Sequence, residues 1–186
     1  MLAREMAESH GIDAAVAKAL GFPRPQYTAV ERERRWLCRA VPHSLIRKTF
    51  DVKDLYVSGT RLRLREMRPI EGGAGLLRLS RKADVDPHTR LITSIYLPEE
   101  EHALLDSILP GDRLHKIRHR LHAPTGALMS VDEFQGHLAG LLLLEAEFDH
   151  DQALGAFSAP DFADREVTSD VRYTGASLAR NGLPNV

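Results

Sequence analysis

Several segments of this chain alternate apolar and charged residues with a period of two, and each charged set has essentially one sign. Arg61, Arg63 and Arg65 alternate with Leu62 and Leu64. Residues i, i+2 and i+4 of a β-strand share a face, so the three arginines are expected side by side. Like charges placed in this way repel, whereas ordinary protein surfaces mix signs. The pattern predicts strands whose charged faces meet a ligand of opposite charge.

Similar segments recur along most of the chain, with few helical patterns between them. A helix is expected after Pro98, where Glu99, Glu100 and Glu101 favour a helix N-terminus. A second helix is expected near the end of the chain. Many strands with few helices predict a closed or nearly closed antiparallel barrel. The expected strands cover 30–37, 60–66, 76–82, 90–97, 116–121, 128–134 and 141–149.

Composition and the chain ends restrict the class of protein further. Residues 1–27 read as a polar leader with a short helix around 14–20, and 28–186 as one globular domain. The start of the chain does not resemble a secretory signal, and the longest apolar run is too short to span a bilayer. Cys38 is the single cysteine, so a disulfide framework is excluded, and we expect a cytoplasmic protein with no membrane partner. The formal net charge of -1 gives no reason to expect a nucleic-acid partner.

The period-two rule also assigns the other charged side chains to faces. We expect the apolar faces to be covered by the helix at 98–109 and the tail helix, so the charged faces line a wet tunnel. For any single strand, the alternative is that its charged face lies on the outside of the barrel and meets water. In that case the protein is a structural barrel that binds no ligand. The sets that share a face are Glu31, Glu33 and Arg35; Arg78 and Lys82; Lys116, Arg118 and Arg120; Ser130 and Asp132; and Glu145 and Glu147.

The chemistry of these sets suits an extended chain of phosphates. Arginine presents planar, bidentate donors to phosphate oxygens, and several arginines can surround one chain. A triphosphate carries about four negative charges, which a few cations and one divalent metal would balance. Mg²⁺ and Mn²⁺ prefer oxygen ligands and bridge carboxylates to substrate phosphates. The basic set is therefore expected to bind phosphates, and the acidic set to bind a metal.

From about Glu31 to about Arg180, the chain resembles the triphosphate tunnel metalloenzymes of the CYTH superfamily. Glu31-Arg32-Glu33-Arg34-Arg35 stands where that family has Glu-x-Glu-x-Lys. The order and strand phase of the motifs carry the resemblance, because each motif alone is common. The other matching segments are Arg61 with Arg63, the strand ending at Lys82, Arg118-His119-Arg120, Asp132 before Phe134 and Gly136, Gly140-Leu141 with Glu145-Ala146-Glu147, Glu166-Val167-Thr168, and Arg172-Tyr173.

The resemblance implies a mainly β fold: an eight-stranded antiparallel closed β-tunnel with peripheral helices. It implies action on triphosphate compounds with Mg²⁺ or Mn²⁺. Arg35 and Asp132 are the expected catalytic residues. Homodimers would be unsurprising, although no sequence feature specifies one. The expected metal ligands are Glu31, Glu33, Glu145 and Glu147, and the expected phosphate ligands are Arg35, Arg61, Arg63, Lys82, Arg118 and Arg120.

Two departures from the family pattern bear on catalysis. Arg35 replaces the family lysine, and an arginine stays protonated, so it suits phosphate binding better than activation of water. The strand after Lys82 lacks the glutamates that some members carry, since it reads Ile92-Thr93-Ser94-Ile95-Tyr96. We predict a metal-dependent triphosphatase, with inorganic triphosphate preferred because no added domain or base-recognition element is evident. The alternatives are a polyphosphate- or nucleotide-binding module without turnover, and a nucleotidyl cyclase.

Overall fold

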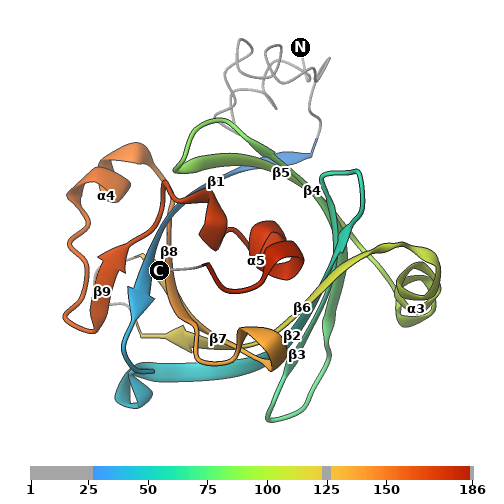
Figure 1. Cartoon of the computed structure of the whole chain (residues 1–186), viewed down its shortest axis with the longest axis horizontal. Helices are drawn as coiled ribbons and strands as arrows, with labels where there is room; N and C mark the ends of the chain where they lie inside the picture. Colours follow the sequence, from blue (N-terminus) through green and yellow to red (C-terminus); the bar gives the residue numbers. More distant parts are fainter. Residues whose placement is uncertain (1–26, 123–126, 185–186) are drawn as a thin grey trace.

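A computed structural model describes residues 27–122 and 127–184 of the chain (Figure 1). The leader helix expected at 14–20 lies outside this part. The described strands are β1 (Thr28–Cys38), β2 (Ile46–Val57), β3 (Leu62–Pro69), β4 (Leu76–Asp84), β5 (Thr89–Tyr96), β6 (Gly111–Leu121), β7 (Leu128–Phe134), β8 (Leu142–Phe148) and β9 (Ala163–Glu166). The α-helices are α3 (Glu99–Ile108), α4 (Asp151–Ala156) and α5 (Gly175–Asn181).

Eight of the strands close into an antiparallel barrel, which confirms the predicted fold class. They follow the order β5-β4-β3-β2-β6-β7-β8-β1, and β5 pairs with β1 to complete the ring, while β9 adds to the edge of β1. Each barrel pairing is antiparallel, and closure leaves no open sheet edge in the ring. Figure 1 shows the ring viewed along its axis.

The sequence pattern did not indicate β2, which completes the eight. Its inward side chains include Val52, Asp54 and Tyr56, which mix apolar, charged and aromatic types. Its outward side chains include Asp51 and Lys53, so neither face has the single sign seen elsewhere. Without a uniform face, the period-two signal is lost, although the strand pairs along its length with β3 and β6.

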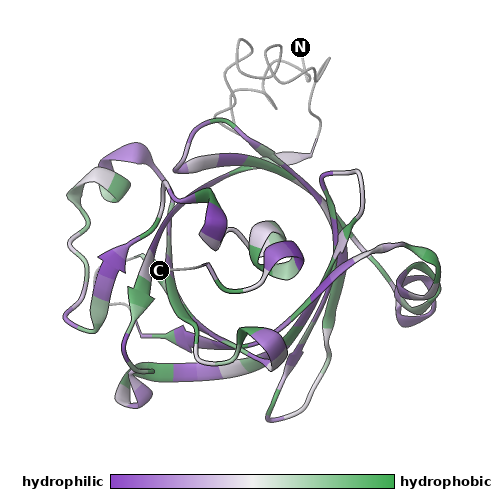
Figure 2. Ribbon diagram, viewed as in Figure 1, coloured by the Kyte–Doolittle hydropathy of each residue, from purple (hydrophilic) through white to green (hydrophobic). Residues whose placement is uncertain are grey.

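Strand phase places the charged faces inside the barrel and a large apolar set outside it. Trp36, Leu144 and Phe148 belong to an outer cluster that Leu154 and Phe157, in and after α4, pack against. Trp36 is thus a core residue. Figure 2 shows hydrophilic and hydrophobic positions alternating along the barrel strands. The segment that carries α4 and β9 therefore covers much of the apolar outside of β1 and β8.

The two expected covering helices behave differently. α5 lies within one end of the ring (Figure 1), where Leu178 is fully buried against an apolar cluster that includes Phe134 and Leu143. α3 lies outside the barrel and buries none of its residues, with Leu104 at 60% and Ile108 at 62% exposed. The expectation that these two helices cover the outer apolar faces is wrong for both, because α5 lies inside the ring and the α4–β9 segment packs on the outer cluster. Among the described residues, no helix is both long and apolar enough to cross a membrane.

Candidate active site in the tunnel

A cavity of about 240 Å³ runs inside the barrel beside the plug formed by α5. Its wall is charged, and basic side chains outnumber acidic ones. This excess of positive charge in a partly enclosed space favours a polyanion. The basic residues of the wall are Arg35, Arg61, Arg63, Arg65, Arg78, Lys82, Arg90, Lys116, Arg118 and Arg180, and the acidic ones are Glu31, Glu33, Asp84, Glu145 and Glu147.

Most of the side chains predicted to be catalytic, to bind phosphate or to bind a metal meet in this one cavity. The exceptions are Asp132 and Arg120, which do not line it. Arg120 lies 4.9 Å from the ring centre of Phe50, so its guanidinium makes a cation–π contact. The predicted residues that do line the cavity are Glu31, Glu33, Arg35, Arg61, Arg63, Lys82, Arg118, Glu145 and Glu147.

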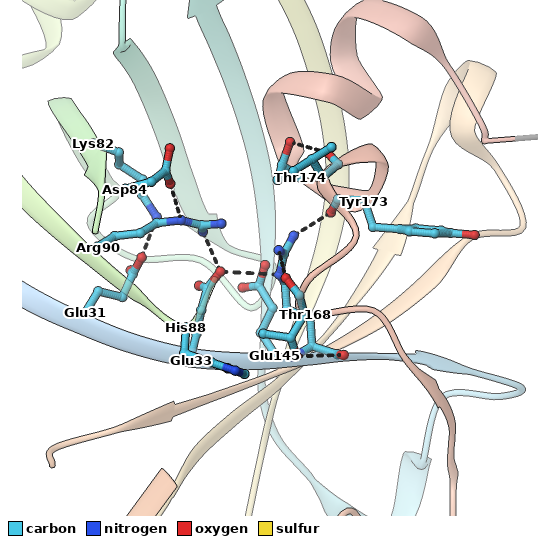
Figure 3. A network of polar contacts seen from close by, with 12 residues as sticks. Glu31, Glu33, Lys82, Asp84, His88, Arg90, Glu145, Thr168, Tyr173 and Thr174 are labelled. Carbon is cyan, nitrogen blue, oxygen red and sulfur yellow. Dashed lines mark hydrogen bonds and ion pairs between the residues drawn. The ribbon is translucent and has the colours of Figure 1, made fainter. Parts of the chain in front are cut away.

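Ion pairs join β1 to β4 and β5 across one wall of the tunnel (Figure 3). Lys82 Nζ donates to Glu31 at 2.7 Å, and Arg90 pairs with both Glu33 and Asp84. Burial raises the pKa of Glu31, but Lys82 and Arg63 together lower it further, so that the pKa lies below its usual value. The pKa of Glu33 is raised by burial and by two nearby glutamates. One wall thus holds carboxylates that repel one another and are partly neutralised by cations.

Asp132, on β7, positions the cations of the opposite wall without lining the cavity itself. The carboxylate is fully buried and accepts hydrogen bonds from Lys116 and from Arg118, at 2.7 Å for Arg118 Nε. Arg118 also pairs with Glu145, whose pKa is raised by burial but held well below its usual range by Arg118 and Lys116. Asp132 therefore orients two cavity cations instead of facing the cavity itself.

Asp54 has the same relation to a second pair of cations, and the sequence analysis missed it. Its carboxylate accepts from Arg65 Nε and Nη2, both at 2.6 Å, and lies 3.7 Å from Arg63 Nε. Burial raises the pKa of Asp54, but Arg65 and Arg63 hold it below its ordinary value. The sequence did not indicate Asp54 because it lies in β2, whose alternation of side chains has no single-sign charged face. Arg90, the first residue of an expected strand, was missed because no second charge shares its face.

Arg35 ties β1 to the segment that leads into α5. Its Nη1 donates to the carbonyl oxygen of Tyr173 at 2.7 Å, and its Nη2 donates to that of Thr168 at 2.9 Å. The guanidinium is buried, and its Nε lies 3.4 Å from Glu33. In Figure 3 the Tyr173 ring points away from the charged cluster while its carbonyl faces the cluster. Arg35 thus lines the cavity, but its two terminal nitrogens already donate hydrogen bonds to the segment that leads into α5.

The four predicted metal ligands lie on two neighbouring strands. Glu33 and Glu147 are directly opposite in the register of β1 and β8, and Arg35 is opposite Glu145. Glu147 makes no ion pair or hydrogen bond within the described residues, and its pKa is raised to about 7 by burial and by Glu31. Hard oxygen donors that repel one another suit a divalent cation. As they lie, no group of three such side chains among the described residues is close enough to hold a metal.

Two further predicted residues have simple positions. Arg61 is exposed just before β3, at the mouth of the cavity. Cys38 is half-buried, and burial raises the pKa of its thiol to about 11, so the thiolate is scarce at neutral pH.

Fold and cavity together define a closed antiparallel β-tunnel with a charged interior and a plugged end. The chain is 42% identical over 69 residues to an inorganic triphosphatase of Nitrosomonas europaea, which covers 37% of this chain and 46% of that protein. It is 33% identical over 86 residues to an inorganic triphosphatase of Acetivibrio thermocellus, which covers 46% of this chain and 53% of that protein. The matches span about half the length of these curated relatives.

A solved structure matches over a larger part of the molecule. The structure of the inorganic triphosphatase NE1496 superposes with a TM-score of 0.57 at 27% identity, covering 83% of this chain and 97% of that chain. No protein-family model matches the chain. The chain therefore shares the closed β-tunnel fold of that inorganic triphosphatase.

Proposed function

We propose that the protein is a metal-dependent triphosphatase that hydrolyses inorganic triphosphate inside the tunnel. The observation that carries the proposal is the convergence of cations and carboxylates from several strands on one enclosed cavity. The relatives named inorganic triphosphatase support the same activity, because they share both sequence and fold with this chain.

The side chains of the cavity have complementary tasks in this proposal. Lys82, Arg63 and Arg118 bind and orient the phosphate chain, since each presents donors to the cavity. Asp54 holds Arg63 in place from behind, and Asp132 holds Arg118. Arg35 keeps the plug closed and limits the entry of water from that end. A wall of this kind stabilises charge that develops on the transferred phosphoryl group.

Mg²⁺ or Mn²⁺ would be held by Glu31, Glu33, Glu145 and Glu147. The bound metal would supply neutralisation of phosphate charge and activation of a water. Three of these carboxylates now pair with Lys82, Arg90 and Arg118. Substrate phosphates compete for the same cations, so substrate binding frees carboxylates for the metal. We therefore infer that metal and substrate bind favourably together.

A binding module without turnover is the second candidate. It is favoured by β5, whose inward residues Ile92 and Ser94 provide no carboxylate, and by Arg35, whose donors are used by the plug. In that case the cavity would bind phosphate chains but lack a group that positions the attacking water.

Orthophosphate release from inorganic triphosphate, with ATP in parallel, tests the proposal. Assays contain Mg²⁺, Mn²⁺ or a chelator, and the melting temperature is recorded with each substrate. We expect metal-dependent release from triphosphate that exceeds release from ATP. A raised melting temperature without any release would contradict hydrolysis and support the binding module. Cyclic nucleotide and pyrophosphate formed from ATP would instead identify a cyclase.

A further inference from the structure

Arg78 is a cavity cation that neither the catalytic nor the binding residues assigned above include. It lies on the inward face of β4, four residues before Lys82, and lines the same cavity. At about 3.4 Å per residue, the two side chains leave the strand about 13 Å apart. On β3 its register partner is Arg65. Arg78 therefore marks the part of the cavity that lies away from the α5 plug.

The guanidinium of Arg78 has no partner in the part of the chain that the structure describes. It makes no hydrogen bond or ion pair there, and its Nε is buried without an acceptor. Other deep cations differ, since Arg65 pairs with Asp54 and Arg118 pairs with Asp132. The contrast singles out Arg78 as a half-buried charge with no carboxylate in hydrogen-bond or ion-pair contact, although Asp54 and Glu31 attract it from farther away.

The neighbouring strand explains why Arg78 is unpaired. The residue of β5 directly opposite Arg78 is Tyr96, which is exposed, and the hydroxyl of the next inward residue, Ser94, is already within 2.7 Å of the Ser80 hydroxyl. No carboxylate of β5 faces Arg78. This wall consequently offers a cation and hydroxyl groups, which suit a phosphoryl group better than a metal ion.

Keeping this charge unpaired is unfavourable for the folded protein. Burial lowers the pKa of Arg78 to about 10, with Arg65 and Arg63 contributing as like charges. Arginine still carries its proton at neutral pH, so the desolvated charge persists. An anion in the cavity would relieve this cost. Residues that weaken the free protein in this way are characteristic of ligand sites.

We propose that Arg78 binds the phosphoryl group that lies farthest from α5 and selects for chains of at least three phosphoryl groups. The inference rests on the proposed function, because it assigns one end of the same substrate. A two-phosphate chain is bound around Lys82, Arg63 and Arg118, which line the same cavity. A third phosphoryl group extends toward Arg78 and gains a charge-assisted contact.

The test compares wild type, Arg78→Gln and, as a matched control, Arg47→Gln. Arg47 is an exposed arginine of β2 that does not line the cavity. Dissociation constants for pyrophosphate and tripolyphosphate are measured by calorimetry with a chelator present, so that no metal-dependent turnover occurs. The melting temperature of each free protein is measured in parallel.

Arg78→Gln is expected to weaken tripolyphosphate binding about tenfold or more and pyrophosphate binding less than about twofold. The melting temperature of the free protein stays equal or rises, whereas Arg47→Gln changes neither quantity. An equal loss for both chains, no loss for either, or a clearly lower melting temperature would overturn the proposal. A wild type that binds tripolyphosphate but never hydrolyses it would overturn the proposed function and leave this inference standing.

Discussion

Single buried carboxylates decide the arrangement of the tunnel wall. Asp54 and Asp132 are both almost completely inaccessible, at 2% and 0% exposure, and each pairs with two cations of the cavity. Cations aligned on neighbouring strands repel, and these carboxylates offset that repulsion from behind. The donors of the arginines are thereby fixed before substrate arrives, which reduces the entropy lost on binding.

We predict that Asp54→Asn lowers the free energy of unfolding by about 3–5 kcal/mol, because it leaves Arg65 and Arg63 buried without their carboxylate. The pKa of Asp54 lies below its ordinary value of 3.8, so its stabilisation is present above about pH 4 and is lost at lower pH. Urea unfolding at neutral pH measures the change. Asp106→Asn, which removes an exposed pair with Arg113, is the control and should cost at most about 1 kcal/mol. Equal effects of the two variants would refute the structural role of Asp54.

At the scale of elements, the position of α5 depends on β1. Leu178 anchors the helix in an apolar cluster, and Arg35 fixes the preceding segment through two carbonyl groups. Gly175 is also required, because a side chain there would meet the Tyr56 hydroxyl at 1.9 Å. Arg35 therefore supports the plug from inside the tunnel.

Arg35→Met should loosen residues 168–181 while leaving the barrel folded. Without the guanidinium, the carbonyl groups of Thr168 and Tyr173 lose their donors, and amide hydrogen exchange in α5 should become at least about tenfold faster. Exchange in β6 and β7 should stay unchanged. Arg34→Met serves as a control on the outer face, because Arg34 pairs with Glu166 outside the tunnel. Unchanged exchange in α5 would show that other contacts hold the plug.

For the whole molecule, the sequence predicted the barrel and most of the cavity but not the partners inside it. Strands with a charged face of one sign, such as the strand with Arg61, Arg63 and Arg65, could be predicted from the sequence. Strand phase alone decides which of their side chains share a face. The role of Asp54 could not be predicted in this way, because neither face of β2 carries charges of a single sign. The contacts of Asp132 depend on the pairing of β7 with β6, which places it opposite Arg118, and those of Arg35 depend on the placement of the segment before α5. Such contacts are set by tertiary packing and cannot be read from local periodicity.

The central claim is that carboxylates in the tunnel hold a metal required for hydrolysis. Glu147→Gln tests this most directly, since Glu147 has no ion pair in the described structure that its loss would break. The measurement is the Mn²⁺ concentration that gives half-maximal orthophosphate release from triphosphate, with Glu133→Gln on the outer face as control. We predict at least about a tenfold increase for Glu147→Gln and no change for Glu133→Gln. An unchanged metal requirement in Glu147→Gln, or no release by the wild type, would contradict the account.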